Sequence, residues 1–93
     1  MCGIAALVAP LPGPEREALV RAMCDLMAHR GPDDHGLYSH DGPQGGGVTL
    51  GHRRLSIIDL AGGHQPMFSA DGRIAVVQNG EIFNFVELAR ELQ

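Results

Sequence analysis

Residues 1–9 read Met-Cys-Gly-Ile-Ala-Ala-Leu-Val-Ala, and this run determines how the rest of the chain is interpreted. It is short, continuously apolar and followed by Pro10 and Pro12, which is typical of a strand buried on both faces. If Met1 is removed, Cys2 carries a thiol and a free α-amine on one residue. An amine with a pKa near about 8 can accept the thiol proton, so such a residue combines a nucleophile with its base. The alternative is a small apolar residue that only begins a strand.

The composition sets limits on the class of protein. The chain has 93 residues, is 44% hydrophobic and 19% charged, and carries a net charge of −4. This fits one small soluble domain and argues against a nucleic-acid or acidic-membrane partner. No segment is long enough to span a membrane. Two cysteines are too few for a disulfide framework, so we expect a reducing, cytoplasmic location.

A helix is predicted over residues 15–29. Its apolar residues recur at helical spacing and form one stripe, made of Leu19, Ala22, Met23, Leu26 and Met27. Gly31 and Pro32 then end the helix. Cys24 lies beside the stripe, and we expect it to serve in packing.

Several strands and a second helix follow. Short strands are expected at 37–38 and 48–50, joined by the glycine-rich residues 41–47, and residues 52–60 are expected to run along a sheet edge and line a pocket. Asp71-Gly72 is a hairpin signal, and residues 73–78 read as a second buried strand. Asn84, with Glu87 three residues later, predicts a capping box for a helix that reaches Leu92.

This order of elements predicts an α/β (α+β) fold with layered packing. The apolar strands need more cover than two helices provide. We therefore expect residues 1–93 to be the N-terminal portion of a larger domain.

Three polar features could support chemistry, and each has a plain alternative. Asn79-Gly80 follows an apolar strand, and its side-chain amide and backbone N–H could form an oxyanion hole, although Asn-Gly also favours turns. Arg54 could bind a carboxylate, and Glu81 an ammonium group; either could equally be a solvated surface residue. No metal site is predicted, because no pair within one clear element has metal-ligand spacing among His29, His35, His40, His52 and His64.

Five motifs occur together and in order: Met1-Cys2-Gly3-Ile4, Arg30-Gly31-Pro32-Asp33-Asp34, Gly-His-Arg-Arg-Leu-Ser-Ile-Ile-Asp-Leu at 51–60, Gln65-Pro66-Met67 and Asn79-Gly80-Glu81-Ile82-Phe83-Asn84. Together they resemble the glutaminase domain of the class II glutamine amidotransferases, above all that of the glutamine-dependent asparagine synthetases. Phe83 stands where that family usually has tyrosine.

The resemblance implies a layered αββα sandwich of the N-terminal-nucleophile hydrolase type, present here as its N-terminal part. It implies that Cys2 attacks the glutamine amide, that Asn79 and Gly80 stabilise the oxyanion, and that Arg54 binds the substrate carboxylate. The glutamine pocket would be shaped by Leu55, Ser56, Ile57, Ile58 and Glu81. The products would be glutamate and ammonia, and ammonia would pass to an activated aspartate.

The resemblance also bears on partners and cofactors. Glutamine is the expected substrate, and ATP and Mg²⁺ are expected only in a synthetase domain beyond Gln93, with no cofactor in this segment. The resemblance is compatible with a homodimer of the full-length enzyme. Two alternatives remain open: a class II amidotransferase with another acceptor, and a truncated module without catalysis.

Overall fold

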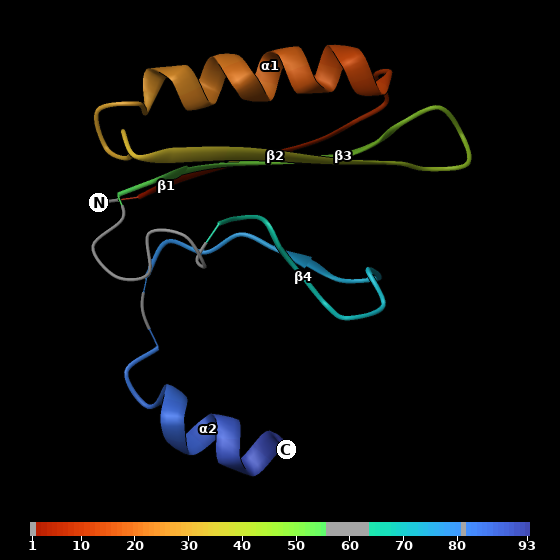
Figure 1. The fold of residues 1–93 in the computed structure, drawn as a ribbon. Coiled ribbons are helices and arrows are strands. Elements are labelled where there is room, and N and C mark those ends of the chain that lie inside the picture. Colours follow the sequence, from red (N-terminus) through yellow and green to blue (C-terminus); the bar gives the residue numbers. More distant parts are fainter. Residues whose placement is uncertain (1, 56–63, 81) are drawn as a thin grey trace.

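The computed structural model describes residues 2–55, 64–80 and 82–93 as a mixed α+β structure with antiparallel strand pairing (Figure 1). Its elements are β1 (Gly3–Ala9), α1 (Gly13–Leu26), β2 (Asp34–Asp41), β3 (Gly47–Arg54), β4 (Met67–Phe68), β5 (Ala75–Val76) and α2 (Phe85–Leu92). The predicted order of strand, helix, strands and helix is confirmed, with β2 and β3 longer than the sequence indicated.

The main sheet has the strand order β1-β3-β2, so β3 is central. β1 pairs antiparallel with β3 from Gly3–Arg53 to Ala9–Gly47, and β2 pairs with β3 from Asp34–Arg54 to Asp41–Gly47. The glycine-rich residues between β2 and β3 close a hairpin, where the Gly42 N–H donates to the Gly46 carbonyl. Gly45 has a positive φ of 85°, which a glycine adopts without strain.

Helix α1 lies across one face of this sheet, as Figure 1 shows. Its buried residues are Gly13, Arg16, Val20 and Cys24. The predicted stripe was therefore wrong: Leu19 is 48% exposed and Leu26 is 79% exposed. Cys24 is buried, which agrees with its predicted packing role.

The Arg16 side chain explains why α1 turns a different face toward the sheet from the one that the apolar stripe predicts. Its side chain is fully buried, Nε donates to Thr49 Oγ1 at 3.2 Å, and the guanidinium also reaches the Leu11 carbonyl and the Asp41 carboxylate at 2.5 Å. A guanidinium that is removed from water needs such partners. Thr49 lies on β3, Asp41 ends β2 and Leu11 lies between β1 and α1. Their positions turn the Arg16 side of the helix toward the sheet.

The opposite face of the sheet is partly open, so the prediction that the first strand is buried on both faces was wrong. Ile4 is 46% exposed and Val8 is 80% exposed. Part of this face is covered by the segment that holds β4 and β5: the rings of Tyr38 and Phe68 meet edge to face with centroids 5.3 Å apart.

The C-terminal half is less regular than the sequence suggested. The hairpin at Asp71-Gly72 is confirmed, but the expected strand at 73–78 is reduced to β5, and Ile74 is 62% exposed. Asn84 occupies the predicted N-cap position of α2 without a side-chain capping hydrogen bond, and no residue of α2 is buried. The apolar stripe of α2 has no extensive packing against another described element, and its side chains stay largely exposed.

No helix in the described parts of the chain combines the length and apolar character needed to cross a bilayer.

The close approach of α1 to the sheet depends on Gly51. A Cβ at this position would lie 2.6 Å from both Cys24 Sγ and a Val20 methyl group. Gly51→Ala should therefore lower the free energy of unfolding by about 1–3 kcal/mol, because overpacking forces the helix away from the strand. Urea unfolding of Gly51→Ala, Val20→Ala and the double variant measures this. The double variant should lose less free energy of unfolding than the sum of the two single losses. Strict additivity would contradict a steric clash between the new Cβ at position 51 and Val20.

Candidate functional site

Cys2 lies directly before β1, and the sheet determines what surrounds it. Gly3, the first residue of β1, pairs with Arg53, so Cys2 lies at the end of the sheet where β3 ends in Arg54. Gly3 faces α1, since a Cβ there would meet the Met27 side chain. Side chains alternate along a strand, so Cys2 and Ile4 belong to the opposite, open face. Cys2 is half-buried.

Arg54 and His52 lie on that same face, two residues apart at the end of β3. Arg54 is 7% exposed and His52 is 1% exposed. The loop of the Arg30–Asp34 motif packs against this strand end. The Asp33 N–H donates to the Arg54 carbonyl at 3.0 Å, and Arg53 Nε donates to the Gly31 carbonyl at 3.0 Å. Two sequence motifs that are twenty residues apart thus meet at the Cys2 end of the sheet.

A further motif comes to this end through Asp34. One Asp34 carboxylate oxygen lies 2.6 Å from His64 Nδ1, and the other accepts the His35 N–H at 2.9 Å. Gln65 follows His64, and its backbone lies so close to Gly36 that a Cβ on Gly36 would collide with the Gln65 carbonyl. Only glycine allows this approach, and it brings residues 64–67 onto β2.

The segment that leads to Asn79-Gly80 is fixed by two side chains. His52 Nε2 lies 3.0 Å from the Gln78 carbonyl oxygen, and the Gln78 N–H donates to Gln65 Oε1 at 2.7 Å. Asn79 and Gly80 come next and are exposed, and Gly80 has a φ of 156°. The candidate oxyanion donors are thereby brought to the sheet end that carries Cys2 and Arg54.

The charges at this end affect two titratable groups. Burial lowers the pKa of His52 below its ordinary value, and the nearby positive charge of Arg54 acts in the same direction, against the hydrogen bond with Gln78. For Asp34, burial raises the pKa, but hydrogen bonds from His64 and His35 and the charges of His64 and Arg54 outweigh it, so the net pKa is lowered. A neutral His52 and an ionised Asp34 therefore accompany Arg54.

The outcome for the predicted site residues is mixed. Cys2 and Arg54 lie at the same end of the sheet, and Asn79 and Gly80 follow Gln78, which His52 holds near that end. Leu55 follows directly and is 36% exposed. Ser56, Ile57, Ile58 and Glu81 lie outside the described residues.

The expectation that residues 52–60 run along a sheet edge is wrong for His52, which lies on the central strand β3. Sequence reasoning predicted neither its contact with Gln78 nor the Asp34–His64 pair. One signal could have identified His52: it lies two residues before Arg54 in a strand, so the two side chains share a face.

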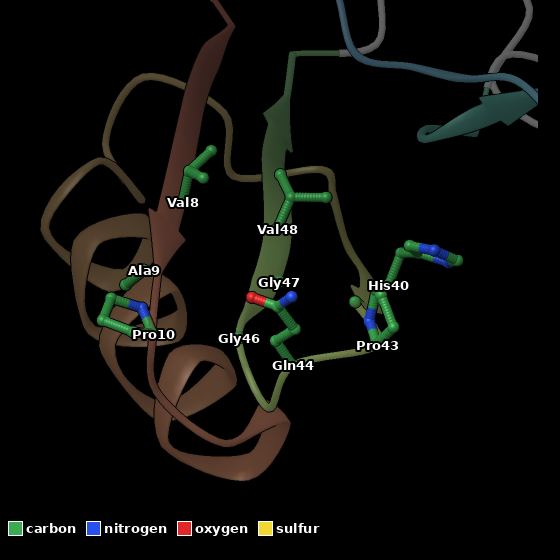
Figure 2. Close-up of a pocket in the computed structure, with 10 residues that line it drawn as sticks. Val8, Ala9, Pro10, His40, Pro43, Gln44, Gly46, Gly47 and Val48 are labelled. Carbon is green, nitrogen blue, oxygen red and sulfur yellow. The ribbon is translucent and has the colours of Figure 1, made fainter.

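A second surface feature lies at the other end of the sheet. It is a shallow depression of about 620 Å³. Figure 2 shows residues that line it, among them Val8, Val48, His40 and Gln44. The six steps along β1 from Gly3 to Ala9 cover about 20 Å, so this depression is separate from the Cys2 site.

No group of three or more His, Cys, Asp or Glu side chains that could hold a metal ion occurs among the described residues.

A family model described as a glutamine amidotransferase domain matches residues 1–93. Relatives include asparagine synthetase (glutamine-hydrolyzing) 1 of Bacillus subtilis, 43% identical over 85% of the chain and 12% of the relative. Asparagine synthetase 2 of Lotus japonicus is 41% identical over 99% of the chain and 15% of the relative. Asparagine synthetase 1 of Arabidopsis thaliana is 40% identical over 100% of the chain and 15% of the relative.

No solved structure matches the chain significantly.

The chain belongs to the glutamine amidotransferase domain family. The resemblance stated from the five motifs is confirmed, including the relation to glutamine-hydrolysing asparagine synthetases. The chain spans between 12% and 15% of the length of these three relatives.

The lowered pKa of His52 predicts how stability depends on pH. The unfolded state has the higher His52 pKa, about 6.5, so it binds the proton first as the pH falls. The contribution of neutral His52 is complete above that unfolded value and is lost as the pH falls below it toward the folded pKa. We expect the free energy of unfolding, measured with urea at several pH values from about 7.5 to 5, to fall less with pH in His52→Gln than in the wild type. Equal pH slopes would contradict the prediction.

Proposed function

We propose that this chain is the glutaminase part of an asparagine synthetase-like enzyme, which hydrolyses glutamine to glutamate and ammonia. One observation carries the proposal: in a chain of this family, Cys2 precedes β1 at the end of the sheet where β3 ends in the buried Arg54. A thiol nucleophile and a fixed cation for a substrate carboxylate are the two groups that such a reaction needs at opposite ends of glutamine.

The proposed reaction uses the α-amine of Cys2 once Met1 has been removed. The amine takes the thiol proton, and the sulfur attacks the side-chain amide carbon of glutamine. The resulting oxyanion is stabilised by the Asn79 side-chain amide and the Gly80 N–H. The proton then passes to the leaving nitrogen, ammonia departs, and a thioester to Cys2 remains. Water attacks the thioester, with the amine again as base, and releases glutamate and free Cys2.

Substrate binding is assigned to the residues around the nucleophile. Arg54 would hold the α-carboxylate of glutamine by a bidentate pair, which its place at the rigid end of β3 supports. Leu55, Ser56, Ile57, Ile58 and Glu81 would shape the remaining pocket.

We further propose that the complete fold is the αββα sandwich of the N-terminal-nucleophile hydrolases, with residues 1–93 as its N-terminal portion. The exposed face of the sheet supports this, because Val8 and Ile4 remain open on the side away from α1. A second sheet there would remove apolar surface from water at roughly 25 cal/mol per Å².

The use of the ammonia is proposed to lie in a synthetase domain beyond Gln93. That domain would bind ATP and Mg²⁺ and present an activated aspartate, and the enzyme would act in the cytoplasm and be compatible with a homodimer. The names of the relatives, all glutamine-hydrolysing asparagine synthetases, support aspartate as the acceptor.

The mechanism requires a free α-amine on Cys2, so the active form should lack Met1. Intact-mass analysis of the purified active protein should show a polypeptide that begins at Cys2. Because the amine is tied up in a peptide bond while Met1 remains, full retention of Met1 in an active preparation would rule out this mechanism.

Cys2→Ala, in the protein at its natural full length, should abolish glutamate release from glutamine. It should leave asparagine formation from added ammonia near the wild-type rate, because Cys2 serves only the release of ammonia. Both rates are measured at saturating aspartate and ATP.

Cys24→Ala is the matched control. Burial raises the pKa of the Cys24 thiol, which makes it a poor nucleophile, and its loss should cost stability without changing either rate. Glutaminase activity that survives Cys2→Ala would refute the assignment of the nucleophile. Glutamate release without asparagine formation in the wild type would instead indicate another acceptor.

A further inference from the structure

The chain between β5 and Asn79 is held by side chains instead of by a strand ladder. The β4–β5 pairing covers only Met67–Val76 and Phe68–Ala75. Two residues after Val76, the N–H of Gln78 donates to the Gln65 side chain and its carbonyl is bound by His52. Both backbone polar groups of Gln78 are therefore fixed, and Asn79 follows directly.

Of these two anchors, His52 is the more rigid. It lies on the central strand β3, with Ile4 on one neighbouring strand and Gly36 on the other as its register partners. Its side chain is 1% exposed, so the ring has no room to change rotamer without displacing its neighbours. The anchor thus belongs to the same strand as Arg54, two residues away.

The direction of the hydrogen bond follows from the chemistry of the partner. A carbonyl oxygen only accepts, so Nε2 of His52 carries the hydrogen and donates it to Gln78. Burial lowers the pKa of the ring, with Arg54 contributing, which favours the neutral form that donates from one nitrogen.

We propose that His52 is a positioning residue of the glutaminase reaction, whose ring holds the Gln78 carbonyl and thereby aims the Asn79 and Gly80 donors at the oxyanion. The inference rests on the proposed function and adds to it a residue that acts through the Gln78 carbonyl. It links the end of the sheet that carries Cys2 and Arg54 to the exposed segment that carries the oxyanion donors.

The kinetic signature follows from the time at which the donors act. Oxyanion donors are complementary to the transition state, so their misplacement lowers kcat, whereas glutamine binding through Arg54 determines much of KM. Misplacing the donors should cost less than removing one, which typically lowers kcat by about 10²–10³-fold. We expect a loss of about 10–100-fold in kcat with KM changed by less than about threefold.

A pair of substitutions isolates the Nε2 donor. The amide nitrogen of glutamine at position 52 can reach the place of Nε2, whereas that of asparagine reaches only the place of Nδ1. In the protein at its natural full length, His52→Asn should lose about 10–100-fold in glutamine-dependent kcat, and His52→Gln should stay within about threefold of the wild type. Ammonia-dependent synthesis should be unchanged in both variants.

His40→Asn is the matched control, because His40 lies on the same sheet face at the far end of β2 and is exposed. It should keep the wild-type kcat and KM. If His52→Asn does not fold, Gln65→Leu removes the other anchor of Gln78 and should lower kcat in the same way.

The inference is overturned if the asparagine and glutamine variants lose kcat equally, if the loss appears in KM, if ammonia-dependent turnover falls with it, or if Gln65→Leu retains full kcat. These outcomes are distinct from failure of the proposed function. Failure of the proposed function would appear instead as a wild-type protein without glutaminase activity, or as a Cys2→Ala variant that keeps this activity.

Discussion

The antiparallel pairing of β1 with β3 is the constraint on which the site depends. It ties seven residues of the N-terminal strand to the central strand, from Gly3–Arg53 to Ala9–Gly47. A chain terminus normally frays, but this ladder begins at Gly3 and therefore holds Cys2 at the end of the sheet where β3 reaches Arg54. The side-chain period of two also makes the register sensitive, because a shift of one residue would turn Cys2 toward α1. Side-chain alternation puts Cys2, the proposed nucleophile, on the face of Arg54, the proposed substrate cation, only in the observed register.

The docking of α1 shows how a buried polar residue can override an apolar pattern. The stripe through Leu19, Met23 and Leu26 has ideal helical spacing, yet a neighbouring face is buried. Periodicity predicts where apolar residues lie on a helix, but it does not predict that the Arg16 guanidinium hydrogen-bonds to four oxygen atoms at one end of the sheet. Satisfying a fully buried guanidinium is worth more than covering one additional leucine.

The sequence predicted the local features well and the long-range ones poorly. The hairpin at Asp71-Gly72, the helix start at Asn84 and the type of most elements follow from local chemistry. Burial does not follow from local chemistry. Val8 and Ile74 are apolar yet exposed, because whether a side chain is covered depends on segments distant in the sequence. For the site, the resemblance carried by the motifs predicted Arg54 and Asn79-Gly80, and their roles stay predictions. The contact of His52 with Gln78 spans 26 residues and depends on the register of three strands, which no local pattern encodes.

The site is therefore built in two ways. One half, Cys2 with Arg54, is positioned by a continuous ladder whose many hydrogen bonds must break together for it to move. The other half, Asn79 with Gly80, extends from a ladder of two residue pairs and depends on individual side chains. Electrostatic stabilisation of an oxyanion works only if the donors are fixed before charge develops. A short, exposed segment gains such rigidity only from the structure around it. In our proposal the buried, neutral His52, which lies two residues from Arg54 on β3, supplies it through the hydrogen bond with Gln78 and adds no charge.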